Sequence, residues 1–322
     1  MIISRAPLSI SLCGDGSDVR SFYEKFGGCV ISTSIRKYAY VYLNPSFDKN
    51  SITLRYSETE SVSEYKDIKH KYFRQVLRDF NVKGVEITSM SDIPSSAGFG
   101  SSSSFLVALL KLIHTYREEP INVYSLAQEA SKIEIDELNS RIGKTDHFSS
   151  AFGGLRFYEY AKDGSVTVNP IVMSSESYRR LQNNLVMFYF KEDKTLETRF
   201  IDCGNKNMAN DVIKQIGEKT RLLKTELESN NIDALGPILN DSWNMRAPVF
   251  DTGLNTNATS NYLLGISSGA TGGKLFSVNG GYFLLFYVPS DDSREKVRKV
   301  FHDANEITFE LDQAGCSIIF ME

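Results

Sequence analysis

The chain has few cysteines and histidines and no long apolar run. Its four cysteines among 322 residues, Cys13, Cys29, Cys203 and Cys316, are widely separated and include no CxxC pair. Neither a disulfide framework nor a zinc site is therefore indicated, and the absence of HExxH argues against a zinc hydrolase. No apolar run approaches the roughly 20 residues of a membrane-spanning helix, and no basic region precedes a long apolar stretch at the N-terminus. We therefore expect a cytoplasmic protein with reduced thiols.

The chain also lacks a large excess of charge of either sign, since its 36 basic and 40 acidic residues give a net charge of −4. Nucleic acid and an anionic membrane are therefore not favoured as partners. A phosphorylated small molecule stays compatible with this balance, because a few well-placed cations can bind it. Hydrophobic residues make up 41% of the chain, which is typical of a globular protein with its own core. The sequence leaves the oligomeric state open, with a homodimer as one alternative.

Strand and helix patterns mix along the whole chain, without the regular alternation of a doubly wound sheet. This mixture predicts an α+β fold in two lobes. A turn signal at Asp163–Gly164 between two short strands places the boundary there and predicts domains 1–165 and 166–322. The predicted strands include 2–12, 29–43, 85–89 and 185–190, and the predicted helices are 66–80, 102–116, 122–138, 207–229, 233–243 and 293–305.

The segment PSSAGFGSSSS, Pro94 to Ser104, carries the clearest chemical signal. Gly98 and Gly100 allow the backbone to turn sharply and to approach a ligand closely. The serines that follow supply hydroxyls and unpaired N–H groups at the start of an apolar helix, and such a helix end favours anions. The alternative is a Ser-rich loop whose last serine caps the helix, but capping needs only one serine. The pattern therefore favours phosphate binding.

Two common nucleotide motifs are absent. The pattern GxxxxGK[ST] fails because Leu138 stands five residues before Gly143. The pattern GxGxxG fails after Gly98 and after Gly14, because Ser103 and Val19 occupy the third glycine position. A Walker A loop and a dinucleotide-binding loop are therefore disfavoured.

PSSAGFGSSSS resembles the phosphate loop of the GHMP small-molecule kinases, Pro-x3-Gly-Leu-Gly-Ser-Ser, with Phe99 in place of leucine. Ile133 to Leu155 is similar to the acidic helix and catalytic-Asp loop of that family, and Gly269 to Pro289 is similar to its C-terminal Gly-rich motif. The RAPLSIS, IGKTD and GGKL segments resemble the D-glycero-D-manno-heptose 7-phosphate kinase group. The resemblance implies a ribosomal-protein-S5-like N-terminal ATP-binding lobe and a ferredoxin-like C-terminal lobe, with the active site in the cleft between them.

The resemblance also implies ATP and Mg²⁺ as cofactors. Ser102 and Glu134 would hold Mg²⁺, and Glu134 lies 12 residues before Asp146, a spacing that matches the family. Taken alone, the residues favour a solvated helix charge at Glu134, because Asp136 and Glu137 lie beside it. The residues expected at the ATP phosphates are Pro94, Gly98, Gly100, Ser101, Ser102 and Ser103.

By the same resemblance, Asp146 accepts or orients the proton of the acceptor hydroxyl. Lys144, two residues earlier, is expected to lower the pKa of Asp146 and keep it ionised. The alternative for Asp146 is a loop aspartate that satisfies its own backbone.

The prediction of acceptor-binding residues starts from the loop GDGSD, which resembles the sugar-binding loop after the first strand in the GHMP kinases. Asp18 is the leading candidate, whereas a plain turn is an equal alternative for Asp15. Arg246 follows Trp243 where the heptose kinases carry a basic residue, and is a candidate for the substrate phosphate. Two glycines, with Lys274, are expected to line the cleft, although they also suit a helix-ending turn. The predicted acceptor-binding residues are Gly14, Asp15, Gly16, Ser17, Asp18, Arg246, Gly272 and Gly273.

Several residues depart from the family pattern and leave the substrate open. Ser9 stands where the heptose group has arginine, and His147 stands where glutamine is common. Asp15 makes the sugar loop GDGSD rather than GGGTD. Three hypotheses follow: a sugar-phosphate kinase acting on a heptose 7-phosphate, a GHMP kinase for another small alcohol or free sugar, and a pseudokinase that binds nucleotide or sugar.

Overall fold

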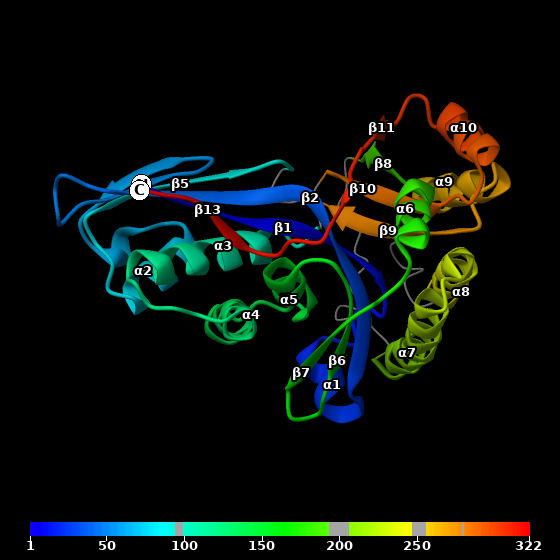
Figure 1. Cartoon of the computed structure of the whole chain (residues 1–322), viewed down its shortest axis with the longest axis horizontal. Helices are drawn as coiled ribbons and strands as arrows, with labels where there is room; N and C mark the ends of the chain where they lie inside the picture. The colour runs from blue at the N-terminus through cyan, green and yellow to red at the C-terminus, as the bar shows by residue number, and fades with distance from the viewer. Residues whose placement is uncertain (94–98, 193–205, 247–255, 279) are drawn as a thin grey trace.

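The computed structural model describes residues 1–93, 99–192, 206–246, 256–278 and 280–322. In these ranges the chain forms two β-sheets flanked by helices (Figure 1), which confirms the predicted α+β class. Pro94 and Gly98, both predicted at the ATP phosphates, lie outside the described residues. No helix within the described ranges is both long enough and apolar enough to cross a membrane.

The larger sheet is built around one long strand, β2. Its strands are β1 (Ile2–Cys13), β2 (Gly28–Pro45), β3 (Ile52–Arg55), β4 (Thr59–Val62), β5 (Val85–Ser91), β6 (Leu155–Tyr160), β7 (Val166–Pro170), β12 (Leu311–Asp312) and β13 (Ser317–Met321). The main order is β13-β1-β2-β5-β3-β4, while β6 and β12 also pair with β2. β1 and β2 pair antiparallel from Ile2 opposite Leu43 to Cys13 opposite Ile31. This pairing places the loop after β1 at the far end of the sheet from residue 1.

Helices of the first half cover one face of the larger sheet (Figure 1). The most buried is α3, whose residues from Leu106 to Leu110 are fully inaccessible to solvent. Its residues 105–110 are all apolar, because β1 and β2 lie on one side of the helix and α4 and α5 on the other. The helices of this half are α1 (Arg20–Phe26), α2 (Lys71–Asp79), α3 (Ser101–Tyr116), α4 (Val123–Ser131) and α5 (Thr145–Phe152), with short helical turns η1 (Tyr65–Asp67) and η2 (Lys132–Glu137).

The smaller sheet is antiparallel, in the order β11-β8-β10-β9. Its strands are β8 (Leu185–Lys191), β9 (Gly272–Val278), β10 (Gly281–Tyr287) and β11 (Asn305–Glu306). Its strands β9 and β10 pair antiparallel from Gly272 opposite Tyr287 to Val278 opposite Gly281. The helices around it are α6 (Ser175–Asn184), α7 (Lys206–Glu228), α8 (Leu235–Arg246), α9 (Thr256–Ser267) and α10 (Asp291–Val300), with the short turn η4 (Ile232–Ala234).

One hydrophobic cluster joins the two sheets. It contains Ile10 of β1, Ile213 of α7 and Phe283 of β10, all buried. Phe99, just before α3, belongs to the same cluster, and its ring centroid lies 4.7 Å from that of Phe283 and 5.6 Å from that of Phe276. The start of α3 is therefore fixed against the smaller sheet.

The sheets do not follow the predicted boundary at residues 165 and 166. β7 begins at Val166 and pairs with β6, while β13 returns to pair with β1. The division into domains 1–165 and 166–322 stays a prediction about folding units. The predicted helix over 66–80 is interrupted, because η1 ends at Asp67 and α2 begins at Lys71, and the one over 293–305 ends at Val300.

Candidate active site

The start of α3 lies against Asp146. Gly100 precedes the helix with φ of 65°, in the left-handed region that favours glycine. A Cβ added there would lie 2.7 Å from Cγ of Asp146, so only glycine permits this approach. Ser101 begins the helix and is buried, and its hydroxyl has no partner among the described residues. With the unpaired N–H groups of a first helical turn, this hydroxyl suits a phosphate oxygen.

Glu134 lies in η2, where the helix α4 widens into a π-helical turn. Its side chain is 2% exposed, so the alternative of a solvated helix charge is wrong. The carboxylate accepts hydrogen bonds from Ser102 Oγ and Ser103 Oγ, both at 2.9 Å. It also accepts from the Tyr72 hydroxyl of α2 and from His147 Nε2, the latter at 2.8 Å. Four donors from three helices thus converge on one carboxylate.

These donors decide the charge of Glu134. Burial by itself raises the pKa of a carboxyl group, but the hydrogen bond and charge of His147 and the hydroxyls of Tyr72 and Ser102 lower the pKa of Glu134 to about 2. The group is therefore an anion at neutral pH. His147 is fully buried, and its Nδ1 has no partner within the described residues.

The donor set around Glu134 fits Mg²⁺. A hydroxyl and a carboxylate are hard oxygen ligands of the kind this ion prefers, and Ser102 and Glu134 already lie within contact of each other. The described residues contain no cluster of three or more His, Cys, Asp and Glu side chains that would form a metal site of protein ligands alone. Mg²⁺ held by one or two protein groups and substrate phosphates does not need such a cluster.

Asp146 lies in the first turn of α5 rather than in a loop. Ser9 Oγ of β1 donates a hydrogen bond to Asp146 Oδ1 at 2.8 Å. Burial raises the pKa of Asp146 to about 6, although the Ser9 hydrogen bond opposes the shift, while the charge of Asp18 adds to it. Such a carboxylate is mostly ionised at neutral pH and binds a proton more readily than an ordinary aspartate does.

The prediction that Lys144 lowers the pKa of Asp146 is wrong. The Lys144 ammonium donates to the Gly164 carbonyl at 2.7 Å and lies 4.9 Å from the ring centroid of Tyr23. The pKa of Asp146 is raised rather than lowered. The reason is that residues two apart at a helix start point to different sides.

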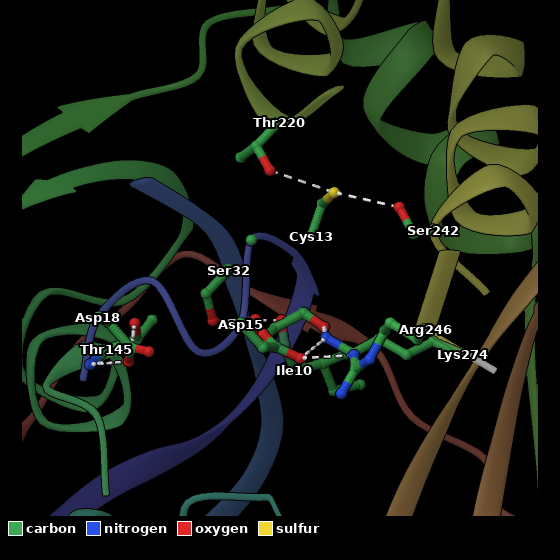
Figure 2. A network of polar contacts seen from close by, with 12 residues as sticks. Ile10, Cys13, Asp15, Asp18, Ser32, Thr145, Thr220, Ser242, Arg246 and Lys274 are labelled. Carbon is green, nitrogen blue, oxygen red and sulfur yellow. Dashed lines mark hydrogen bonds and ion pairs between the residues drawn. The ribbon is translucent and has the colours of Figure 1, made fainter. Parts of the chain in front are cut away.

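Asp18 holds the loop after β1 against α5. Its carboxylate accepts from the Thr145 backbone N–H at 3.1 Å and from Thr145 Oγ1 at 2.6 Å (Figure 2). A Cβ at Gly143 would lie 1.9 Å from Asp18 Oδ2, so the chain before α5 passes directly over this carboxylate. Burial raises the pKa of Asp18. Asp18 thereby fixes the residue next to Asp146, and contact with an acceptor stays a prediction.

The glycines and serine of this loop maintain its shape. Gly14 has φ of 99°, and a Cβ there would lie 2.1 Å from the Cys29 carbonyl oxygen. Gly16 also has a positive φ, of 89°. The Ser17 hydroxyl donates to the carbonyls of Gly14 at 2.7 Å and Cys29 at 2.9 Å. Ser17 is buried, and these bonds hold the loop backbone, while its contact with an acceptor stays a prediction.

Asp15 faces two cations from the second half of the chain (Figure 2). Its carboxylate forms an ion pair with Lys274 of β9, and Arg246 Nη1 at the end of α8 lies 3.7 Å from its Oδ2. Ser11 Oγ also donates to it. Burial acts to raise the pKa of Asp15, but the charges of Lys274 and Arg246 lower it. The structure thus brings Arg246 to the GDGSD loop.

Gly272 and Gly273 allow close packing around β9. A Cβ at Gly272 would lie 1.8 Å from the Gly236 carbonyl oxygen of α8, and one at Gly273 would lie 2.6 Å from the Leu285 carbonyl oxygen of β10. Both glycines begin a strand and are buried, so the alternative of a helix-ending turn is wrong. The structure gives them a packing role, and their contact with an acceptor stays a prediction.

Sequence reasoning missed Tyr72, Thr145 and the contacts of His147 with Glu134. Tyr72 lies 62 residues from Glu134 on a separate helix, and no local pattern connects the two. Thr145 could have been noticed as a hydroxyl residue at the start of an unpredicted helix, since such residues commonly cap helices.

Comparisons with known proteins show which sequences and folds the chain resembles. Residues 68–154 match the model of the GHMP kinases N terminal domain. D-glycero-alpha-D-manno-heptose 7-phosphate kinase of Campylobacter jejuni is 26% identical over 305 residues, which cover 89% of each chain. The crystal structure of a D-glycero-D-manno-heptose 1-phosphate kinase from Bacteroides thetaiotaomicron superposes with a TM-score of 0.82 over the whole of both chains, at 22% identity. Galactokinase of Lactococcus lactis superposes with a TM-score of 0.73 over 98% of this chain and 94% of that one, at 16% identity.

The two sheets and their helices have the fold of the GHMP kinase structures, which the chain matches over nearly the full length of both chains. The chain resembles the GHMP kinases over most of its length, and residues 68–154 match the N-terminal domain of that family.

Proposed function

We propose that the chain is an Mg²⁺- and ATP-dependent kinase that phosphorylates the anomeric hydroxyl of D-glycero-D-manno-heptose 7-phosphate. The products would be the 1,7-bisphosphate and ADP, and the bisphosphate would feed nucleotide-heptose and surface polysaccharide synthesis. The observation that carries the proposal is the meeting of Asp146, Gly100 and the serine-lined start of α3 beside Glu134. The choice of a heptose phosphate rests on the relative from Campylobacter jejuni.

The start of α3 supplies the groups for the nucleotide. Gly100 and Ser101 to Ser103 would bind the ATP phosphates through N–H groups and hydroxyls, while Ser102 and Glu134 would hold Mg²⁺. ATP supplies the transferred phosphoryl group, and Mg²⁺ offsets negative charge when it is bound. Because Glu134 is ionised at neutral pH, its charge is available for the cation without the loss of a proton.

Asp146 is the proton acceptor of the proposal. Ser9 Oγ donates a hydrogen bond to its Oδ1, so Oδ2 would accept the proton of the acceptor hydroxyl. A general base of this kind contributes about 10²–10⁴-fold to the rate. Gly100 lies in contact with the same carboxylate, so the acceptor hydroxyl and the nucleotide phosphates would meet there. Phosphoryl transfer depends mainly on such positioning and on charge stabilisation.

Arg246 is the proposed partner of the acceptor's own phosphate. It lies at the end of α8 and is partly buried. Its Nη1 lies 3.7 Å from Oδ2 of Asp15 in the GDGSD loop. A guanidinium binds phosphate well because its planar N–H groups match two phosphate oxygens.

The test is ADP release with Mg-ATP and a panel of heptose 7-phosphates, hexose phosphates, free sugars and mevalonate. Asp146→Asn serves as the catalytic variant. Asp163→Asn is its matched control, because Asp163 is an exposed turn residue bonded to Ser165. Turnover of one heptose 7-phosphate that disappears in Asp146→Asn and persists in Asp163→Asn supports the proposal.

Two other outcomes would replace the proposal. Turnover of unphosphorylated acceptors alone would indicate a kinase for a free sugar or another small alcohol, and galactokinase of Thermotoga petrophila is 25% identical over 160 residues. ATP binding without turnover on the whole panel would indicate a nucleotide-binding protein that does not catalyse.

A further inference from the structure

The hydroxyl of Tyr72 completes the hydrogen bonding of the Glu134 carboxylate. Oε1 of Glu134 accepts from Tyr72 and from Ser102 Oγ, whereas Oε2 accepts from Ser103 Oγ and His147 Nε2. An ionised carboxylate offers about four acceptor positions on its two oxygens. Side chains of the protein therefore occupy all of them, and a cation can bind this carboxylate only by displacing one donor.

The two oxygens of Glu134 have different surroundings. The donors of Oε2, Ser103 and His147, are 1% and 0% exposed, so this oxygen is turned toward the interior. One donor of Oε1, Ser102, is only partly buried. Because Ser102 is also the second proposed ligand of Mg²⁺, the cation would approach Glu134 at Oε1.

Tyr72 lies close to both proposed ligands. Burial raises the pKa of Tyr72, as do the charge and hydrogen bond of Glu134, whereas hydrogen bonding with Ser102 acts to lower it. The phenol oxygen therefore lies beside the position that a cation shared by Ser102 and Glu134 needs. A serine hydroxyl that binds a cation through an oxygen lone pair keeps its proton and can still donate it to a carboxylate. Tyr72 is thus the donor that a cation at Oε1 would displace.

The ring of Tyr72 is held independently of its hydroxyl. Its centroid lies 5.8 Å from that of the His70 ring and 6.1 Å from that of the Phe105 ring. Tyr72 belongs to the first turn of α2, and Phe73 and Leu77 of the same helix are fully buried. We therefore expect the helix to stay folded when the hydroxyl alone is removed.

We propose that the Tyr72 hydroxyl occupies part of the Mg²⁺ position between Ser102 and Glu134, and that the cation displaces it on binding. This inference rests on the proposed function, because it takes Ser102 and Glu134 as the metal ligands. Tyr72 is then a positioning residue whose hydroxyl satisfies Glu134 in the metal-free chain and competes with Mg²⁺ for Oε1. Because a buried carboxylate short of a partner is costly, the hydroxyl stabilises the metal-free state and weakens metal binding.

The test compares Tyr72→Phe with the parent chain and uses Mn²⁺ as a probe of the metal site. Electron paramagnetic resonance measures free Mn²⁺ in the presence of ADP, so the affinity is obtained without turnover. Tyr56→Phe is the matched control, because the Tyr56 hydroxyl donates to the Glu60 carboxylate at 2.7 Å in a second tyrosine–glutamate pair near the start of α2. Glu134→Gln shows whether the measured Mn²⁺ is bound at Glu134.

In Tyr72→Phe we expect Mn²⁺ to bind about tenfold more tightly, because a hydrogen bond to a charged group no longer has to be broken. Tyr56→Phe should leave the affinity unchanged, and Glu134→Gln should weaken it. Near-ultraviolet difference spectra give a second readout. Mn²⁺ should shift a tyrosine band in the parent chain and in Tyr56→Phe but not in Tyr72→Phe, because Tyr72 is the tyrosine that loses its partner.

A Tyr72→Phe variant that is folded by circular dichroism and binds Mn²⁺ equally well or more weakly would overturn the inference. An unchanged Mn²⁺ affinity in Glu134→Gln would also overturn it, because the metal would then bind elsewhere. Tighter Mn²⁺ binding in Tyr72→Phe without turnover of any acceptor by the parent chain would support the displacement and contradict the proposed function. Turnover of the heptose phosphate with an unchanged Mn²⁺ affinity in Tyr72→Phe would do the reverse, so failures of the two proposals are distinguishable.

Discussion

Glu134 and Asp146 are both buried carboxylates near the start of α3, yet their pKa values move in opposite directions. Glu134 accepts hydrogen bonds from four side chains, one of them His147, and its pKa falls to about 2. Asp146 accepts a side-chain hydrogen bond from Ser9 and lies near two other acids, and its pKa rises to about 6. The comparison shows that the number and charge of the donors decide the shift, whereas burial alone would raise both.

The difference divides the chemistry between the two carboxylates. A group that stays ionised at all ordinary pH values suits a cation, whereas a group that titrates near neutrality suits a proton. Four predictions test this division, and the first concerns the residue whose replacement should reduce activity most.

Replacing Asp146 should have the largest effect. Asp146→Asn keeps the size of the side chain and can still accept the Ser9 hydrogen bond, but it removes the proton acceptor. We expect kcat to fall by about 10²–10⁴-fold while nucleotide affinity stays unchanged. Single-turnover kinetics and ADP calorimetry measure the two quantities. An equal loss of nucleotide binding would contradict the proton-transfer role.

Glu134→Gln should affect the metal rather than the proton. The variant removes the negative charge, so we expect the Mg²⁺ concentration for half-maximal activity to rise by about tenfold or more. Activity should recover in part at high Mg²⁺. A Mg²⁺ titration of ADP release measures the shift, and an unchanged titration would remove Glu134 from the metal site.

His147→Gln tests whether the donors of Glu134 tune its affinity for the cation. A neutral amide replaces the strongest donor, so the pKa of Glu134 should rise and Mg²⁺ affinity should fall by up to about tenfold. His114→Gln is the matched control, because His114 bonds Glu129 at 2.7 Å in another histidine–glutamate pair. Equal effects of the two variants would mean a loss of stability rather than of tuning.

Ser9→Ala should have the smallest effect, and it should appear only in the pH profile. In the parent chain, kcat should decline as the pH falls through about 6, because Asp146 becomes protonated. The Ser9 hydrogen bond favours the ionised form, so its removal raises the pKa further and moves the decline to higher pH. At pH 8 kcat should be nearly unchanged.

Ser4→Ala is the control for Ser9→Ala, because Ser4 lies on the same strand and its buried hydroxyl bonds the Ala108 carbonyl at 2.7 Å. This variant loses a comparable hydrogen bond far from Asp146. Its pH profile should match that of the parent chain.

The sequence alone identifies the residues of the site better than their contacts. The run of glycine and serine before α3 predicts its anion-binding start, because the chemistry lies in adjacent residues. The approach of Gly100 to Asp146 depends on two segments 46 positions apart, and the hydroxyl of Tyr72 reaches Glu134 from a third helix. Such contacts depend on packing, which single-sequence patterns do not contain.

Side-chain direction explains the error at Lys144 and the contacts of Asp15 that the sequence does not predict. Lys144 is near Asp146 in sequence, but the start of α5 turns the two side chains apart. The GDGSD motif left Asp15 open between acceptor binding and a plain turn, and the structure adds two cations from β9 and α8, more than 200 residues later. The sequence shows both charges but not their distance.

The pairing of β1 with β13 has a consequence for synthesis on the ribosome. Ile2 pairs with Met321, and β12 reaches β2 with Leu311 opposite Ile35. At about 5–20 residues per second, these partners emerge from the ribosome roughly 15–60 s apart. The flank of β1 that receives β13 stays open for that interval, and an unpaired strand edge is prone to associate with other chains. We therefore expect nascent chains of this protein to depend on chaperones until residues 317–321 are available.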